Sequence, residues 1–266
     1  MSCEFFQAIT KAVNSGSKLV IIKIEKGSNV VTDIILNGRP MLGLVKDPEI
    51  LRLAEEALRS NMAIEETMNE FKVRVEPFEA RPTVIIVGSG LVAKALARLA
   101  NYLGYYVAVV GNGDVNNNDF SMATLITNNL EDLGRLVTEG SIVLIANEGG
   151  KPYDADALHI AITRGASFVG LLASQKRGAV MIAEMIRRGV SLDTIKARLH
   201  TPMGIDIGGK TAEEVALSIM AEVVMEIRHG SGKRMMEVKD PYKLLNDALE
   251  GKITEQSCSW KPSTVI

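Results

Sequence analysis

The chain has 266 residues, of which 47% are hydrophobic and 23% charged, as in an ordinary soluble globular protein. Lys and Arg total 30 and Asp and Glu total 32, so the formal net charge of −2 argues against a nucleic-acid-binding protein. The two cysteines, Cys3 and Cys258, and three scattered histidines provide neither a disulfide framework nor a zinc motif. Without a signal-like apolar run or a stretch approaching 18 apolar residues, the sequence predicts a cytoplasmic protein that spans no membrane.

The first part of the chain is typical of a small α+β domain over residues 1–78. Strands are expected at residues 17–27, 29–38 and 71–78, and helices at residues 2–14 and 48–61. Asp47 and Pro48 open the second of these helices, and Pro77 is expected to end the last strand. Residues 79–82 are the predicted linker.

After the linker the pattern changes to alternating strands and helices. Strands are expected at residues 83–87, 105–110, 121–128, 141–147 and 167–174. Helices are expected at residues 91–104, 153–165, 176–189, 191–199 and 211–230. This order predicts an α/β fold in which residues 83–232 form a Rossmann-like, doubly wound parallel sheet. Residues 233–266 form a tail with one weak helix near residues 241–251.

A glycine motif joins the first of these strands to the first helix. Its G-x-G-x-x-A pattern comprises Gly88, Ser89, Gly90, Leu91, Val92 and Ala93. Gly88 permits the tight turn, Gly90 lets a phosphate approach the backbone, and Ala93 allows close helix–strand packing. The backbone amides from Ser89 to Val92 are therefore predicted to hold phosphate at the helix N-terminus. A glycine turn that serves packing alone is the alternative.

The end of the second strand lacks the acid that a dehydrogenase uses to hold ribose. Gly111 stands there, followed by Asn112, and Asp114 comes only in the polar loop at residues 113–120. An ordinary NAD contact is therefore not predicted, although an NAD(P)-dependent oxidoreductase remains an alternative. Asn112 and Asn147 follow strands at the ligand edge of the sheet, so both are candidate cofactor contacts or plain loop caps.

Other polar residues follow the fourth and fifth strands at the same edge. Ser174, Lys176 and Arg177 come after the fifth strand, where they could meet phosphate or an acidic protein surface, or form a solvated helix start. Glu148 is the one acid considered for proton transfer. His200 is expected to be structural.

Residues 204–211 match the P-loop pattern G-x-x-x-x-G-K-[ST] letter for letter. A P-loop follows a buried strand, whereas this segment follows a helix end and Pro202. The match is therefore interpreted as accidental, with Lys210 and Thr211 as a helix start and its cap. Thr211 and Glu214 have the spacing of a capping box.

Further motifs connect the second half of the chain to a known family. A strand with Gly-Leu and a following Ser precedes a basic pair, and a Pro-x-Gly-x-Asp-Ile-Gly segment precedes the long last helix. The matching residues are Gly170, Leu171, Ser174, Lys176, Arg177, Pro202, Gly204, Asp206, Ile207, Gly208, Glu214, Ala216, Ser218, Ile219, Ala221 and Glu222. From residue 75 to about 230 the chain resembles the XdhC/CoxF family, accessory proteins of molybdenum hydroxylases such as xanthine dehydrogenase and carbon monoxide dehydrogenase.

The chain departs from the family pattern at three places. The family usually carries a G-G-G-C-x-E segment, a C-G-G segment and a His-containing stretch after the fourth strand. Here residues 41–50 and 67–78 lack both cysteines, and Asn147-Glu148-Gly149-Gly150 replaces the histidine stretch. A divergent paralogue is therefore one interpretation.

The resemblance implies a cofactor chaperone rather than a turnover enzyme. It would bind the molybdenum cofactor in its pterin dinucleotide form, support its sulfuration and deliver it to a client hydroxylase, including one of the aldehyde oxidoreductase type. Asp206 joins the candidate cofactor contacts, unless it only braces a turn. The expected partners are the client, a sulfur donor and a second copy of the chain. A ligand-free regulatory paralogue is a further alternative.

The methionines at helical spacing are expected in the core or at a dimer face: Met181, Met185, Met220 and Met225.

Overall fold

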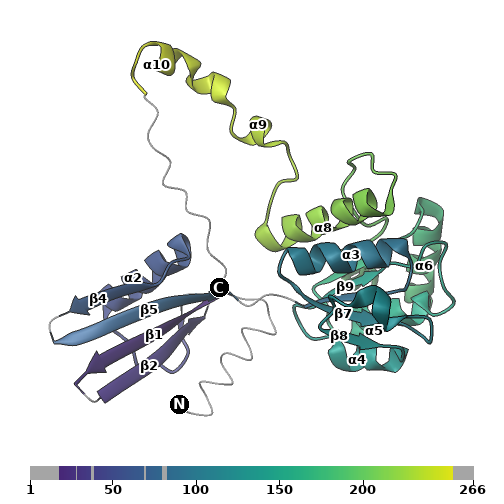
Figure 1. Ribbon diagram of the computed structural model, residues 1–266, viewed down its shortest axis with the longest axis horizontal. Helices are drawn as coiled ribbons and strands as arrows, with labels where there is room; N and C mark the ends of the chain where they lie inside the picture. The colour runs from purple at the N-terminus through teal and green to yellow at the C-terminus, as the bar shows by residue number, and fades with distance from the viewer. Residues whose placement is uncertain (1–17, 28, 37–38, 69, 80–82, 254–266) are drawn as a thin grey trace. The chain divides into compact units, whose positions relative to one another are not determined.

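The computed structural model describes residues 18–27, 29–36, 39–68, 70–79 and 83–253 (Figure 1). By its contacts the chain divides into two compact units, Met1–Val223 and Val224–Ile266, and both β-sheets belong to the first. The expected helix at residues 2–14 and the terminal segment 260–266 lie outside the described residues. The domain boundaries set out above stay predictions.

An antiparallel sheet forms the N-terminal part. Its strands lie in the order β3-β2-β1-β5-β4, with β1 Lys18–Lys26, β2 Asn29–Leu36, β3 Arg39–Pro40, β4 Ile64–Met68 and β5 Phe71–Glu79. The helix α2, Pro48–Ser60, packs its apolar stripe on the face that holds Val20 and Ile22. It starts where the sequence predicts, because the Asp47 carboxylate accepts the Glu49 N–H at 2.9 Å. The short strands β3 and β4 were not predicted.

Pro77 does not end β5, contrary to the sequence expectation, because the strand continues to Glu79 and Pro77 lies opposite Val20 of β1. On its other side β5 pairs with β4 only as far as Val75. Within the described part of the chain Pro77 therefore lies at a free strand edge, where the missing N–H of proline breaks no ladder bond.

The loop before α2, where the chain departs from the family pattern, is held by a buried carboxylate. Asp33 is fully buried in β2. Its oxygens accept the N–H groups of Ile34, Leu42, Leu44 and Val45 at 2.7–3.0 Å. Four backbone donors compensate the cost of burying the carboxylate and fix the course of residues 41–45.

The second sheet is the predicted doubly wound parallel sheet. Its strands are β6 Thr83–Val87, β7 Tyr106–Val110, β8 Leu125–Thr127, β9 Ile142–Ile145, β10 Phe168–Leu171 and β11 Leu199–His200. They lie in the order β11-β10-β9-β6-β7-β8, and all adjacent pairs are parallel. This is the 3-2-1-4-5-6 order of a Rossmann fold, whose ligand edge lies where β6 and β9 diverge.

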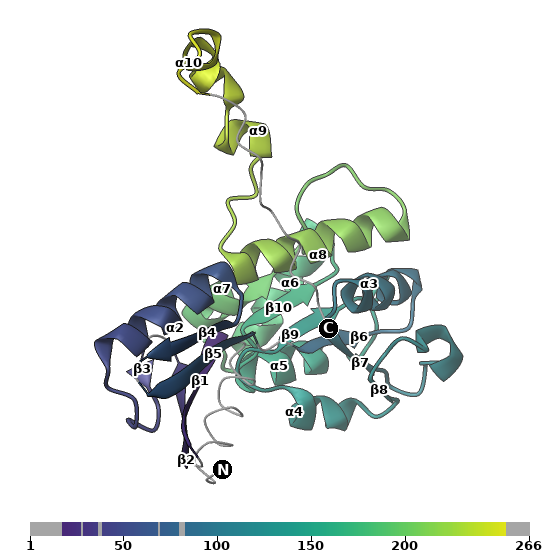
Figure 2. The same cartoon turned by 60° about the vertical axis from the view of Figure 1, so that its left-hand side comes forward.

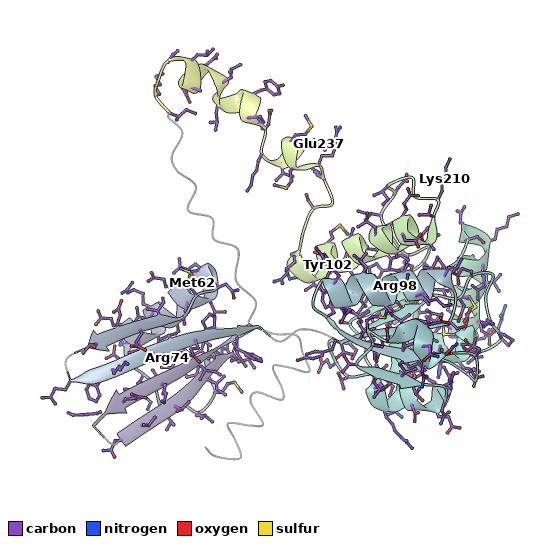
Figure 3. All side chains as sticks on the ribbon, viewed as in Figure 1. Met62, Arg74, Arg98, Tyr102, Lys210 and Glu237 are labelled. Atoms are coloured by element: carbon purple, nitrogen blue, oxygen red, sulfur yellow. The ribbon has the colours of Figure 1, made fainter. Side chains whose placement is uncertain are left out.

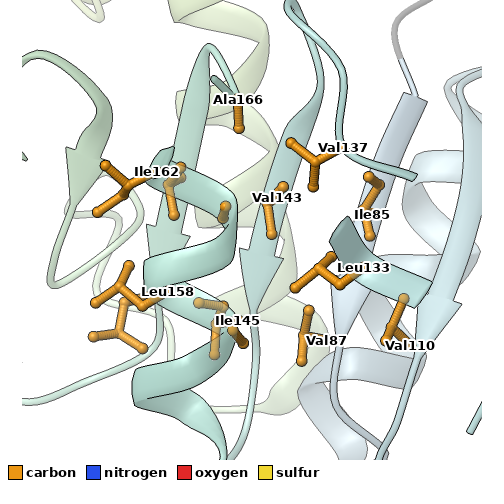
Figure 4. Packing of buried hydrophobic residues seen from close by; sticks show 14 of the residues in the cluster. Ile85, Val87, Val110, Leu133, Val137, Val143, Ile145, Leu158, Ile162 and Ala166 are labelled. Atoms are coloured by element: carbon orange, nitrogen blue, oxygen red, sulfur yellow. The ribbon is translucent and has the colours of Figure 1, made fainter. Parts of the chain in front are cut away.

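Helices cover both faces of this sheet. They are α3 Leu91–Tyr102, α4 Leu133–Leu136, α5 Asp154–Thr163, α6 Gln175–Arg187, α7 Leu192–Arg198 and α8 Ala212–Arg228, with short 3-10 turns η1 Asn117–Phe120 and η2 Leu130–Asp132. On one face Ile85, Val87 and Ile145 pack against Leu133 of α4 and Leu158 of α5 (Figure 4). Figure 1 shows α3 and α8 together on the other face.

Three of the four methionines singled out in the sequence lie in this core. Met181, Met185 and Met220 are at most 9% exposed, whereas Met225 is half-buried. The three buried ones therefore serve packing within the chain rather than a dimer face.

The described part of the second unit continues the end of α8 into short helical turns. These are α9 Met235–Val238, η3 Pro241–Leu244 and α10 Leu245–Leu249, the last two at the predicted weak helix (Figure 2). Their apolar side chains, such as Tyr242 and Leu249, are exposed. Over the described residues, no helix combines the length and apolar character needed to cross a bilayer.

Candidate functional site

The glycine loop between β6 and α3 is pressed against the end of β9. Gly88 has a φ of +141°, and a Cβ there would lie 2.8 Å from both Ala146 O and Asn147 Oδ1. Its N–H donates to Val110 O at 3.0 Å. Ala93 is fully buried. The strand, the tight turn and the close helix packing predicted for this motif are therefore all present.

The N-terminus of α3 holds an anion supplied by the chain itself. Gly90 is the N-cap residue and has no side chain to cap the helix. Instead, the Val92 N–H donates to Glu148 Oε1 at 2.6 Å. A Cβ on Gly90 would lie 1.8 Å from Glu148 Oε2, so the carboxylate lies directly over this glycine. The position predicted for phosphate thus has a carboxylate beside it.

The acid missing from the end of β7 is supplied by Asp114. Gly111 has no room for a side chain, because a Cβ there would lie 2.5 Å from Val115 Cγ2 and 2.9 Å from Asp114 Oδ1. Asp114 accepts the Ser89 hydroxyl at 3.1 Å and the Asn112 N–H at 3.0 Å. A carboxylate therefore does contact the glycine loop, three residues later than the usual position. The Asn112 side chain is exposed.

Two further groups surround Asp114. The Tyr153 hydroxyl donates to Oδ2 at 3.0 Å, and Lys151 Nζ lies 3.5 Å from the same oxygen. Burial alone would raise the pKa of Asp114, but the donors from Asn112, Tyr153 and Ser89 outweigh it and leave the pKa below its ordinary value. Burial, and then the Asp114 carboxylate, raise the pKa of Tyr153. Tyr153 is therefore a neutral hydrogen-bond donor rather than a base near pH 7.

A buried network lies beneath the loop at the end of β9. Asn147 and Asp154 are 2% and 1% exposed, and the Asn147 amide donates to Asp154 Oδ1 at 2.7 Å. Asp154 Oδ2 accepts the Lys151 N–H at 3.1 Å and pairs with the Arg177 guanidinium. Asp154 can only accept, which fixes the Asn147 amide with Oδ1 turned toward Gly88. Asn147 Oδ1 has no hydrogen-bond partner in the described part of the chain.

The candidates after β10 divide between structural and exposed positions. Ser174 caps α6 by accepting the Arg177 N–H at 3.3 Å. Arg177 turns inward, where it pairs with Asp154 and donates to Leu172 O at 3.2 Å. Lys176 is exposed. The structure therefore brings Arg177 and Asn147 together through Asp154, and Arg177 acts as a partner of that acid in this arrangement.

Asp206 lies in the loop before α8. It is exposed and accepts the Gly208 N–H at 3.2 Å, a bond within its own turn. The capping box predicted at the end of the P-loop-like segment is confirmed. Thr211 Oγ1 accepts the Glu214 N–H, and Glu214 Oε2 accepts the N–H groups of Thr211 and Lys210. Figure 3 shows the Lys210 side chain on this loop.

His200 has a structural role, as the sequence suggests. Its ring stacks on Phe168 with centroids 4.0 Å apart, and Nδ1 lies 2.9 Å from Glu222 Oε1. Glu222 also accepts the Gly204 N–H. Burial alone would raise the pKa of Glu222, but these two partners bring it below its ordinary value.

Sequence reasoning missed Lys151, Tyr153 and Asp154 as members of the site. Lys151 and Tyr153 lie between β9 and α5, soon after Asn147 and Glu148, and Asp154 is the first residue of α5. Their position after a strand at the ligand edge was the available signal. No group of three or more His, Cys, Asp or Glu side chains suited to a metal ion occurs among the residues described here.

Residues 84–223 match the family model of the XdhC Rossmann domain, which accounts for more than half of the chain. The chain belongs to the XdhC family. The match covers both the glycine loop and the capping box of α8, so the family resemblance seen in the sequence is confirmed.

Two individual proteins are similar to this XdhC-family chain. The uncharacterized protein YqeB of Escherichia coli strain K12 is 32% identical over 168 residues, which are 60% of this chain and 30% of that protein. The chain thus spans about a third of the length of this curated relative. A crystal structure of a protein described as a xanthine dehydrogenase, from Bacillus halodurans, matches with a TM-score of 0.54 and 20% identity. The match covers 92% of this chain and 69% of that one, and it shows a shared fold.

Proposed function

We propose that this protein binds the molybdenum cofactor in a pterin dinucleotide form and delivers it to a client hydroxylase of the xanthine dehydrogenase type. The proposal rests on family membership and on two observations at the site. The N-terminus of α3 beside Gly90 already accepts an anion, and the unpartnered Asn147 Oδ1 lies next to the same loop.

The residues present suit the two ends of such a ligand. Its pyrophosphate would replace the Glu148 carboxylate at the Val92 N–H, where the helix dipole favours negative charge. A ring N–H or a ribose O–H would donate to Asn147 Oδ1 and satisfy that buried acceptor. The exposed Lys151 and Lys176 offer further phosphate contacts. The cofactor supplies the chemistry after transfer, and this chain holds, orients and releases it.

A titration under anaerobic, reducing conditions tests the proposal. Wild-type protein is titrated with the pterin dinucleotide form of the cofactor, with NAD and NADP as competitors. Saturable binding that nicotinamide nucleotides do not affect is expected. Gly90→Val should abolish this binding, since the new side chain displaces only the flexible end of Glu148 and fills the phosphate position.

Gly134→Val is the matched control, because a Cβ there keeps at least 3.7 Å from its neighbours and lies outside the site. If a folded Gly90→Val variant binds the cofactor as well as the control does, the glycine loop is not the binding site. A client and a sulfur-donating partner would be sought once binding is established. A homodimer and a cytoplasmic location remain predictions.

One observation favours the oxidoreductase as a second candidate. Asp114 contacts Ser89 of the glycine loop and could accept the ribose hydroxyls of a nicotinamide nucleotide. Tight NAD(P) binding and spectral turnover of NAD(P)H, without cofactor binding, would replace the chaperone by this function. Lack of binding to all three ligands would favour a regulatory paralogue.

A further inference from the structure

Glu148 is an unusual partner for the N-terminus of α3. It comes from the loop after β9, 56 residues beyond Val92, and its side chain is exposed. Helices normally receive their N-terminal acceptor from the cap residue or from the first turn. In α3 the cap is Gly90 and the first turn has no acid. The N-terminus of α3 is therefore bound by the Glu148 carboxylate, whose exposed side chain can turn toward solvent.

A second observation at the same loop points to a ligand. Asn147 precedes Glu148 in the chain, is 2% exposed, and leaves Oδ1 without a donor within the described residues. Buried acceptors in native proteins nearly always have a donor, because an unmet one is costly. Beside Gly90, the N-terminus of α3 is thus occupied by the Glu148 carboxylate. Beside Gly88, the acceptor Asn147 Oδ1 has no donor among the described residues.

We propose that Glu148 gates the anion site: its carboxylate and a phosphate group of the ligand compete for the N-terminus of α3. This inference deepens the proposed function and rests on it for the identity of the ligand. A small anion that displaces Glu148 gains only the contacts at the N-terminus of α3. A nucleotide-like ligand gains the donor position at Asn147 as well, so Glu148 selects against free phosphate and pyrophosphate. It also returns to the site when the cofactor leaves.

The test uses inorganic pyrophosphate as the probe and calorimetry as the readout on the full chain. Glu148→Gln keeps the shape of the side chain and removes its charge. We expect it to bind pyrophosphate about tenfold more tightly than wild type, because a like charge near the phosphate is gone. Glu148→Ala, which removes the whole competitor, should bind at least as tightly as Glu148→Gln.

Glu214→Gln is the matched control, because Glu214 also lies at the N-terminus of a long helix and accepts two backbone N–H groups there. It should leave pyrophosphate affinity unchanged. Thermal melts of all variants establish that each is folded.

The outcomes separate the gate from the function. If folded Glu148→Gln and Glu148→Ala bind pyrophosphate no more tightly than wild type, Glu148 is a helix cap only and the gate is wrong, whatever the cofactor titration gives. A gain that Glu214→Gln shares would also overturn it. If the Glu148 variants gain pyrophosphate but wild type and variants all ignore the pterin dinucleotide, the gate stands and the proposed function fails.

Discussion

Two glycine-rich loops of this protein lead into two long helices, and they satisfy the helix N-termini in different ways. The loop at Gly88 leaves α3 without a local cap, and Glu148, 56 residues away, supplies the acceptor. The loop before α8 is closed by Thr211 and Glu214, only three residues apart. The second loop has the residue pattern of a phosphate-binding motif, but Glu214 of the same loop and helix already accepts its backbone N–H groups. The first can release its anion without breaking a turn.

The two loops also differ in the burial and bonding of the acidic side chains next to them. Beneath Gly88, Asp154 is 1% exposed and is paired with Arg177 and Asn147. Around the second loop the acids Asp206 and Glu214 are exposed and bond only within their own turn. Under the proposed function the Gly88 loop keeps its shape while its anion leaves, and such a rigid support would serve that purpose.

The largest expected effect comes from removing that support. Asp154→Ala leaves Arg177 and the Asn147 amide without their partner in a largely buried place, which should lower the free energy of unfolding by about 3–5 kcal/mol. Urea denaturation followed by circular dichroism measures this change.

Asp156→Ala is its control, since Asp156 lies on the same helix, is 57% exposed and pairs with Arg188 on the surface. It should cost less than about 1 kcal/mol. Equal losses for the two variants would mean that the network does not support the loop.

A substitution of one glycine in each loop sharpens the comparison. Gly88→Ala combines a φ of +141° with a Cβ 2.8 Å from the backbone oxygen of Ala146, and should cost about 2–3 kcal/mol. Gly208→Ala has a φ of +72° and open space, so only the backbone penalty applies, about 1 kcal/mol. The measurement is the difference between the two unfolding free energies. A Gly208→Ala variant as unstable as Gly88→Ala would show that the close approach to β9 is unimportant.

The same contrast explains what the sequence could predict. The capping box of α8, the N-cap Asp47 and the buried strands of the parallel sheet are local patterns, and all were found. The parallel pairing of the sheet followed from the βαβ alternation, because parallel strands need crossover connections between them. The short strand β4 is mostly exposed and carries three consecutive polar residues, so no periodic signal marked it.

The candidate site was predicted only in part, because its local glycine motif is visible in the sequence and its long-range contacts are not. The loop and its position were predicted from Gly88 and Gly90 and the preceding strand. The two hydroxyl groups that donate to Asp114 come from Ser89 and Tyr153, 25 and 39 residues away, and no spacing rule links such pairs. Arg177 was expected to face a ligand, yet it neutralises Asp154, whose burial only the folded chain reveals.

The smallest effect concerns the acids of the two loops. Both Asp114 and Glu214 have pKa values below their ordinary ones. The stability that each adds is therefore full above the pKa of its unfolded form, about 4, and is lost as the pH falls through the lower folded pKa. At pH 7, Asp114→Asn should lower the free energy of unfolding by about 1 kcal/mol, and this difference should shrink below pH 4.

Two donors to Asp114, Ser89 and Tyr153, are distant in sequence and Asn112 is a neighbour, whereas the backbone donors to Glu214 are all its own neighbours. Tyr153→Phe removes one distant donor and should raise the pKa of Asp114 toward its ordinary value while leaving that of Glu214 in place. An NMR titration of the carboxyl carbons between pH 2 and pH 6, roughly the range over which both acids titrate, measures both. If Tyr153→Phe shifts neither pKa, the Tyr153 hydroxyl does not hold Asp114, and Asn112, Ser89 and Lys151 do. The segment after β9 would then contribute only the Lys151 ammonium group to the acid beside the glycine loop.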